Sequence, residues 1–249
     1  NLWPGLLLQS IMLCFIAAYL LHDGTQAFLA KVGGIKQEVG YTFAFVSYML
    51  SGALLPELMR MVFFQGWKPR WENLRNFALT GPFIGLMGVT VDFFYRCQNA
   101  WFGVGNDWGT LVTKVLVDQL LYSPFLANLL CTMFFTLRDG RFSREVFASI
   151  FTLGFITEKL LPVQIAGWAF WFPAVACIYF MPPQLQIPFA VLVQAFWVLM
   201  VTRRSIIQNI WQVFDDYREK KRSAQRRKES ASFIGSFYRH QFARKFAVN

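Results

Sequence analysis

The 249-residue sequence has few of the residues that build metal and catalytic sites. It contains two histidines, His22 and His240, and four cysteines, none of which has a neighbour at metal-ligand spacing. These counts argue against a zinc, haem or di-iron site, and we expect the cysteines to be small buried side chains. No phosphate-binding loop is present, because "FGVGND" lacks the lysine and the spacing of one. The sequence therefore predicts neither an enzyme nor a cofactor, with bound pigment or lipid left open.

Apolar residues, in contrast, are abundant. They make up 55% of the chain, which includes 28 Phe, 9 Trp and 8 Tyr. This composition indicates a single polytopic membrane domain. Since a helix needs about 20 apolar residues to cross a bilayer, we predict an all-α transmembrane bundle of about six crossings. The apolar runs are 3–22, 42–64, 76–97, 110–137, 164–181 and 185–202, and a shorter run at 146–161 is interpreted as an interfacial or linker helix.

Prolines interrupt the fifth apolar run and end it. Pro173 removes a backbone donor, which a membrane helix tolerates only where neighbours cover the freed carbonyl. We therefore expect a kinked span packed inside the bundle. Pro182 and Pro183 then end this helix, and we expect a return crossing after them, with a surface helix as the alternative.

The basic excess of the chain lies at its end. Of the net charge of +10, residues 203–249 supply +8, from twelve Lys/Arg and four Asp/Glu. A basic segment directly after an apolar run favours anionic lipid over nucleic acid, for which no recognised fold is present. Its spaced aromatic residues suit a lipid interface or a partner's groove. The candidate contacts are Arg203, Arg204, Phe233, Phe237, Phe242 and Arg244.

Three apolar runs carry an acid and a base at helical spacing, which places both on one helix face. Charges within the hydrocarbon are costly, so we expect them in the bundle interior, paired, or near an interface. The intramembrane pairs are Glu57–Arg60, Asp92–Arg96 and Lys114–Asp118. Asp92 also continues a small-residue stripe of Gly81, Gly85 and Gly88, whose spacing lets helices approach closely.

Three segments resemble the Mpv-seventeen and peroxisomal-membrane-protein-twenty-two family. They are "GPFIGLMGVTVDFFYR" (81–96), "KVLVDQLLYSPF" (114–125) and "WFPAVACIYFMPP" (171–183), in the family's order. The resemblance implies a four-span core in organelle membranes, chiefly the inner mitochondrial and peroxisomal membranes, and a pore-like or homeostatic role. Ala176, Tyr179 and Pro56-Glu57 depart from the family's polar signature. The residues that match its motifs are Asp118, Gln119, Pro124, Pro173, Phe180 and Pro182.

These observations divide the chain into an N-terminal transmembrane extension with a loop (1–41), a family-like core (42–203) and a basic aromatic tail (204–249). The favoured hypothesis is a non-enzymatic structural or interaction subunit of a larger membrane complex, because the polar residues are few and the aromatic bulk fills space. Its partners would be membrane lipids, anionic ones included, and other membrane subunits, without nucleic acid. The expected location is the mitochondrial inner membrane, with peroxisomal or plastid membranes as alternatives. A small pore or solute channel is the alternative function.

Overall fold

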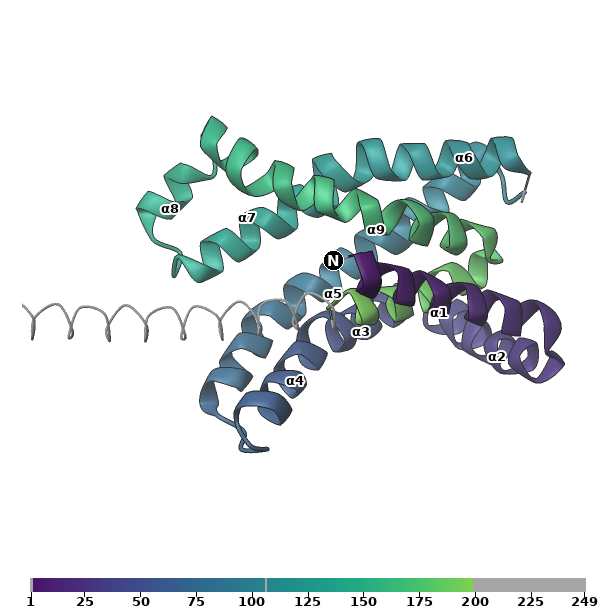
Figure 1. Ribbon diagram of the computed structural model, residues 1–249, viewed down its shortest axis with the longest axis horizontal. Helices are drawn as coiled ribbons and strands as arrows, with labels where there is room; N and C mark the ends of the chain where they lie inside the picture. The colour runs from purple at the N-terminus through teal and green to yellow at the C-terminus, as the bar shows by residue number, and fades with distance from the viewer. Residues whose placement is uncertain (1, 106, 199–249) are drawn as a thin grey trace, which may run out of the picture. The chain divides into compact units, whose positions relative to one another are not determined.

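The computed structural model describes residues 2–105 and 107–198, and its elements are all helices (Figure 1). Side chains are described from residue 10 onward, apart from residue 106. The prediction of an all-α protein is confirmed for this part of the chain. The tail contacts predicted at Arg203, Arg204, Phe233, Phe237, Phe242 and Arg244 lie outside the described residues, as does the predicted domain 204–249.

Four helical stretches are long and apolar enough to cross a membrane. The first joins α3 (Tyr41–Met49), η1 (Leu50–Leu54) and α4 (Leu55–Phe64), and the second is α5 (Trp71–Phe102). The third joins α6 (Trp108–Val117), η2 (Asp118–Ala127) and α7 (Asn128–Asp139). The fourth joins η3 (Phe155–Leu160) and α9 (Leu161–Phe180). The elements labelled η are π-helices.

The remaining helices differ from the expected six crossings. The N-terminal run forms α1 (Leu2–Leu21), and a sharp bend of 100° separates it from α2 (Asp23–Val39), a helix that the sequence reading missed. This bent pair gives a fifth crossing only if it counts as one span. The run at 146–161 is divided between α8 (Arg144–Ser149) and η3, which begins the fourth span. The described helices thus support four crossings.

The paired prolines break the chain where the sequence predicted. After α9 ends at Phe180, a new apolar helix runs from Pro183 to Val198, too short within the described residues to qualify as a span. Pro173, however, does not lie inside the bundle as expected. The α9 helix runs through it and buries Phe170, Ala174 and Ile178, while Pro173 itself is on the exposed face.

Each π-helix has a proline in it or within two residues of its end. Pro124 lies within η2, and Pro56 and Pro162 follow η1 and η3. A π-helix pairs each carbonyl with the amide five residues later, and proline has no amide to give. The prolines therefore remove one backbone donor each at defined positions along three of the spans.

The α3 and α5 helices pack along each other through glycines (Figure 1). A methyl group at Gly88 would lie 2.7 Å from the backbone oxygen of Ala44 and 2.5 Å from the Tyr48 ring, and one at Gly85 would meet Phe45. Gly81 faces Met49 in the same way. We call the contact of Gly81, Gly85 and Gly88 with residues 44–49 the glycine interface. It confirms the predicted close approach.

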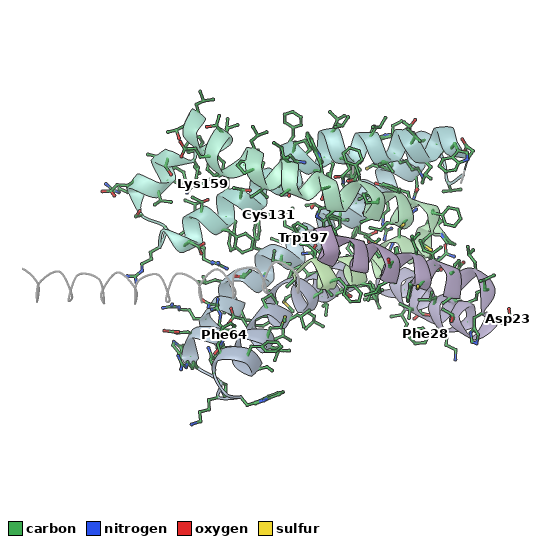
Figure 2. The ribbon with its side chains drawn as sticks, in the orientation of Figure 1. Asp23, Phe28, Phe64, Cys131, Lys159 and Trp197 are labelled. Atoms are coloured by element: carbon green, nitrogen blue, oxygen red, sulfur yellow. The ribbon has the colours of Figure 1, made fainter. Side chains whose placement is uncertain are left out.

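Large apolar side chains also cover the outside of the described helices. Phe28 is 64% exposed and Phe64 48% exposed, and both can be found in Figure 2. Since a water-facing surface rarely carries so many large apolar groups, a membrane is the environment that this surface suits.

Candidate functional site

Asp92 is the centre of a buried charge cluster at one end of α5. Its carboxylate is 1% exposed and lies 2.9 Å from Lys36 Nζ through Oδ1. Arg96 approaches the same carboxylate with Nε and Nη2, each at 3.2 Å. The predicted Asp92–Arg96 pair is therefore present. Lys36 was missed because the sequence reading placed residues 23–41 in a loop, although the spacing of Leu29, Gly33 and Lys36 along α2 marks its buried face.

A cavity of about 250 Å³ lies against this cluster. Lys36 and Gln37 line it from α2, and Gln184 and Gln186 line it from the helix that begins at Pro183. Both helices carry polar side chains that the sequence analysis did not single out. The residues that complete the lining are Asp92, Tyr95, Arg96, Asn99, Pro183 and Ile187.

Lys114 lies behind the cavity, and its partner is not the predicted one. It is 2% exposed, and Nζ donates to Asn99 Oδ1 at 2.7 Å. Asn99 in turn donates to Gln186 Oε1 at 3.2 Å. No ion pair joins Lys114 to Asp118 within the described chain, so the pairing inferred from their four-residue spacing is wrong. Helical spacing does put Lys114 and Asp118 on one face. Beside Asn99, Lys114 also contacts the ring of Tyr179, whose centroid lies 5.7 Å from Nζ.

Asp118 is buried with neutral partners. Its Oδ2 accepts a hydrogen bond from Tyr179 Oη at 2.9 Å, and its Oδ1 accepts one from Gln119 Nε2 at 2.8 Å. Gln98 Nε2 donates to the same Tyr179 oxygen and to the Lys114 carbonyl, each at 3.0 Å. Tyr179 thus connects α9 with α5 and η2. The sequence reading treated this tyrosine as a lost polar signature residue, although its hydroxyl supplies a polar group at that position.

In the π-helix at Asp118–Ala127, a backbone carbonyl accepts a hydrogen bond from α9. In π spacing the partner of the Gln119 carbonyl is the amide of residue 124, which is a proline. Trp168 Nε1 of α9 donates to this carbonyl instead, at 2.8 Å. The family-motif residues Gln119 and Pro124 therefore act together, since the proline frees the carbonyl that the tryptophan binds.

Further along the same face, amide and hydroxyl side chains form a small cluster. Asn128 donates to Gln164 Oε1 at 2.7 Å and to Ser123 Oγ at 3.2 Å, and Gln164 donates to the same hydroxyl. This cluster joins α7 and η2 to α9. We call the polar side chains from Lys114 to Asn128, with their partners Gln98, Asn99, Gln164, Trp168 and Tyr179, the polar interface.

A separate polar cluster surrounds Glu57 at the other end of α5. Glu57 accepts from Asn73 at 2.8 Å and from Asn76 at 3.3 Å, and Arg60 lies 3.5 Å away. The predicted Glu57–Arg60 pair is thus present, with Arg60 half exposed. Nineteen residues separate Asn73 from Asp92, about 28 Å at 1.5 Å per residue. The two charge clusters therefore lie about one bilayer thickness apart along α5.

Other predicted residues have simpler positions. Phe180 and Pro182 are half-buried at the turn after α9. The four cysteines are free, Cys14 is exposed, and the other three are half-buried, so their expected burial is wrong. Within the described residues, no group of three or more His, Cys, Asp or Glu side chains has an arrangement suited to a metal ion.

Comparison of the chain with family models, curated proteins and solved structures found no match. The family resemblance read from the sequence therefore remains a prediction.

Proposed function

We propose that the protein is a non-enzymatic integral membrane protein whose polar interface forms a closed, gated path for a small solute. The observation that carries this proposal is the lack of a direct ion pair for two buried charges. Lys114 and Asp118 have only neutral hydrogen-bond partners among the described residues. A pair kept only for stability gains most when the charges contact each other, because each buried charge is otherwise costly. Ionisable side chains inside a membrane domain more often mark a solute or proton route.

The extent of the polar interface supports the same proposal. From Lys114 to Asn128 it follows one helical stretch through α6, the whole of η2 and the start of α7. Gln98 and Gln119 each keep a buried side-chain carbonyl oxygen that has no hydrogen-bond partner among the described residues. Buried polar atoms without partners are rare in folded proteins and call for an explanation. The explanation that we propose is that these oxygens lack partners in the closed state and accept hydrogen bonds when a solute or water enters.

The low number of polar residues in the apolar runs favoured a structural subunit. The described helices bury thirteen polar or charged side chains, several of them amides far from any charge pair. That number shifts the balance toward a solute path, which the family resemblance also implied. The glycine interface, in contrast, packs α3 closely against α5, so a path would run through the polar interface instead.

A structural or interaction subunit remains the second candidate. The most apolar window of the Trp108–Asp139 span has none of its residues buried inside the bundle. A neighbouring subunit or lipid would cover this surface. In either case we propose an organelle membrane, the mitochondrial inner membrane first, as the site of action.

Flux through liposomes tests the proposed path. The full chain is reconstituted alone, and efflux of trapped inorganic phosphate and of trapped mannitol is measured against protein-free vesicles. We expect efflux of at least one probe, its loss in Asp118→Asn, and unchanged efflux in the exposed control Asp23→Asn. Thermal unfolding of each variant shows that it has folded. Background efflux for the native chain, or equal efflux for Asp118→Asn, would favour the structural subunit.

A further inference from the structure

We infer that the cavity beside Asp92 binds a phosphate group. The inference rests on the proposed function, since it names the class of solute or lipid that this end of the path recognises. It is carried by the charges, the free hydrogen-bond donors and the position of the cavity.

The charge of the lining is positive. Lys36 and Arg96 face the cavity, and Asp92 is its one carboxylate among the described lining residues. Lys114 adds a further positive charge directly behind Asn99. A small cavity in a bundle of low dielectric strengthens this field. An anion is therefore the ligand whose charge the lining complements.

The lining also has more donors to offer than acceptors. Both oxygens of Asp92 are already occupied, Oδ1 by Lys36 and Arg96 and Oδ2 by Arg96. Arg96 uses Nε and Nη2 for this contact, and its Nη1 has no partner among the described residues. The Arg96 guanidinium lies 4.5 Å from the centre of the Tyr41 ring, which holds its plane beside the cavity. Arginine with free N–H groups in a fixed plane is suited to an oxyanion.

Two amides extend the donor set around the cavity. Gln37 and Gln184 line it, and neither has a hydrogen-bond partner within the described residues. The donors come from α2, from α5 and from the helix that begins at Pro183. Groups that converge from three elements match a tetrahedral anion better than a flat carboxylate. The cavity volume of about 250 Å³ leaves room for the group that carries the phosphate.

The position along α5 fits both a lipid headgroup and a dissolved phosphate. Arg96 lies about 14 Å from the midpoint of α5 at 1.5 Å per residue, close to half the thickness of the hydrocarbon core. Phosphates of lipids lie just outside that depth, in the headgroup region, and dissolved anions reach it from water. The chemistry recognised is the same, so the experiment separates the two sources.

Binding is measured on the full chain in neutral detergent, as the shift of the thermal unfolding midpoint with ligand concentration. One arm adds inorganic phosphate against chloride at equal ionic strength. The other arm adds phosphatidic acid in mixed micelles against phosphatidylcholine. We expect a saturable rise in at least one arm. A rise with inorganic phosphate assigns a dissolved ligand, and a rise with phosphatidic acid alone assigns a lipid headgroup.

Two variants with matched controls place the binding at the cavity. Gln184→Glu supplies a carboxylate to the lining without touching the Asp92 pair, so it should abolish the rise, while Gln26→Glu on the exposed side of α2 should keep it. Lys36→Gln should weaken binding about tenfold or more, as expected for loss of a charged hydrogen bond. Its control is Lys31→Gln, which removes an exposed lysine of the same helix.

The outcomes separate this inference from the proposed function. No rise in either arm, or the same rise for Gln184→Glu and the native chain, overturns the phosphate site. Binding that depends on Gln184 and Lys36 in a protein without efflux supports the site and counts against the path. Efflux that needs Asp118 in a protein that binds no phosphate supports the path and overturns the site.

Discussion

The glycine interface and the polar interface both include residues of the same helix, α5, but join it to different elements. In the first, Gly85 and Gly88 bring α5 against Phe45 and Tyr48 of α3, with contacts mainly between carbon atoms. In the second, α6 and η2 meet α9 through hydrogen bonds such as those of Asp118 with Tyr179 and Gln119 with Trp168. One surface is closed by shape and the other is held by polar groups.

The difference follows from how each interface treats the backbone. Across the glycine interface α5 keeps α geometry, although Pro82 removes one backbone donor, and small residues let the backbones approach. Across the polar interface the η2 segment has π geometry, and a proline frees a carbonyl for a side chain of another helix. The glycine interface should therefore be destabilised most by added side-chain volume, and the polar interface by the loss of hydrogen bonds.

The largest effect is expected at Asp92, which continues the glycine stripe of α5. Asp92→Ala leaves Lys36 and Arg96 without a counter-charge, and breaking a buried pair costs about 3–5 kcal/mol. The Lys36 side chain is 8% exposed and that of Arg96 47% exposed, so Lys36 should cause most of the loss. Adding Lys36→Met should therefore restore much of the unfolding free energy, whereas adding Arg96→Met should restore little. Equal rescue by both would contradict this ranking.

Gly88→Ala tests the shape of the glycine interface. The added methyl would lie 2.7 Å from the Ala44 carbonyl oxygen, so backbone must shift, and such overpacking costs about 1–3 kcal/mol. Gly34→Ala is the control, because a methyl group added at this position of α2 would have nothing within 4 Å. It should stabilise the helix by about 0.5–1 kcal/mol. Chemical denaturation in detergent measures both, and similar effects of the two changes would show that the interface is not tightly packed.

A double-mutant cycle tests the hydrogen bond at the π-helix. Trp168→Phe removes the donor to the buried Gln119 carbonyl, and an unsatisfied buried group costs about 1–3 kcal/mol. In the background of Pro124→Ala the new amide at residue 124 takes over that carbonyl, so the same change should cost less. The difference in unfolding free energy between the two backgrounds measures the coupling. A cost that does not depend on residue 124 would show that the proline does not free the carbonyl.

The glycine interface was predictable from sequence, and the polar interface largely was not. Regular spacing in one long helix put Gly81, Gly85 and Gly88 on one face, and α5 has the α geometry that this argument assumes. Regular spacing also paired Lys114 with Asp118, and the turn between them is α-helical, but Asn99 of another helix binds Lys114 and Tyr179 of a third binds Asp118. Partners from distant segments leave no trace in local spacing.

Lys36 shows a second limit of the sequence reading. It lies in a stretch too polar to count as an apolar run, yet α2 places it against Asp92. Composition identified the four stretches that are apolar enough to cross a membrane, while a more polar helix was taken for a loop. The four-residue spacing of Asp92 and Arg96 still predicted their contact, because both belong to one regular helix.

The smallest effect concerns the caps at which the two interfaces begin. The N-cap of α3 is Gly40, whose φ of 64° favours a residue without a side chain. The N-cap of α6 is Asp107, whose Oδ1 accepts a hydrogen bond from the Thr110 amide at 3.0 Å. That bond lowers the pKa of Asp107, so the carboxylate contributes stability above its ordinary pKa of about 3.9 and loses the contribution as the pH falls through the lowered value.

Asp107→Asn keeps a capping oxygen but does not titrate. The native chain should therefore exceed this variant in unfolding free energy by a small constant amount at neutral pH, and the difference should vanish in acid, below the lowered pKa. Gly40→Ala should lower the unfolding free energy by an amount that does not change with pH. Its cost comes from the positive φ of residue 40, and no titratable group is involved. Unfolding measured between neutral and acidic pH compares the two, and a difference for Asp107→Asn that persists unchanged into acid would show that the cap acts through shape alone.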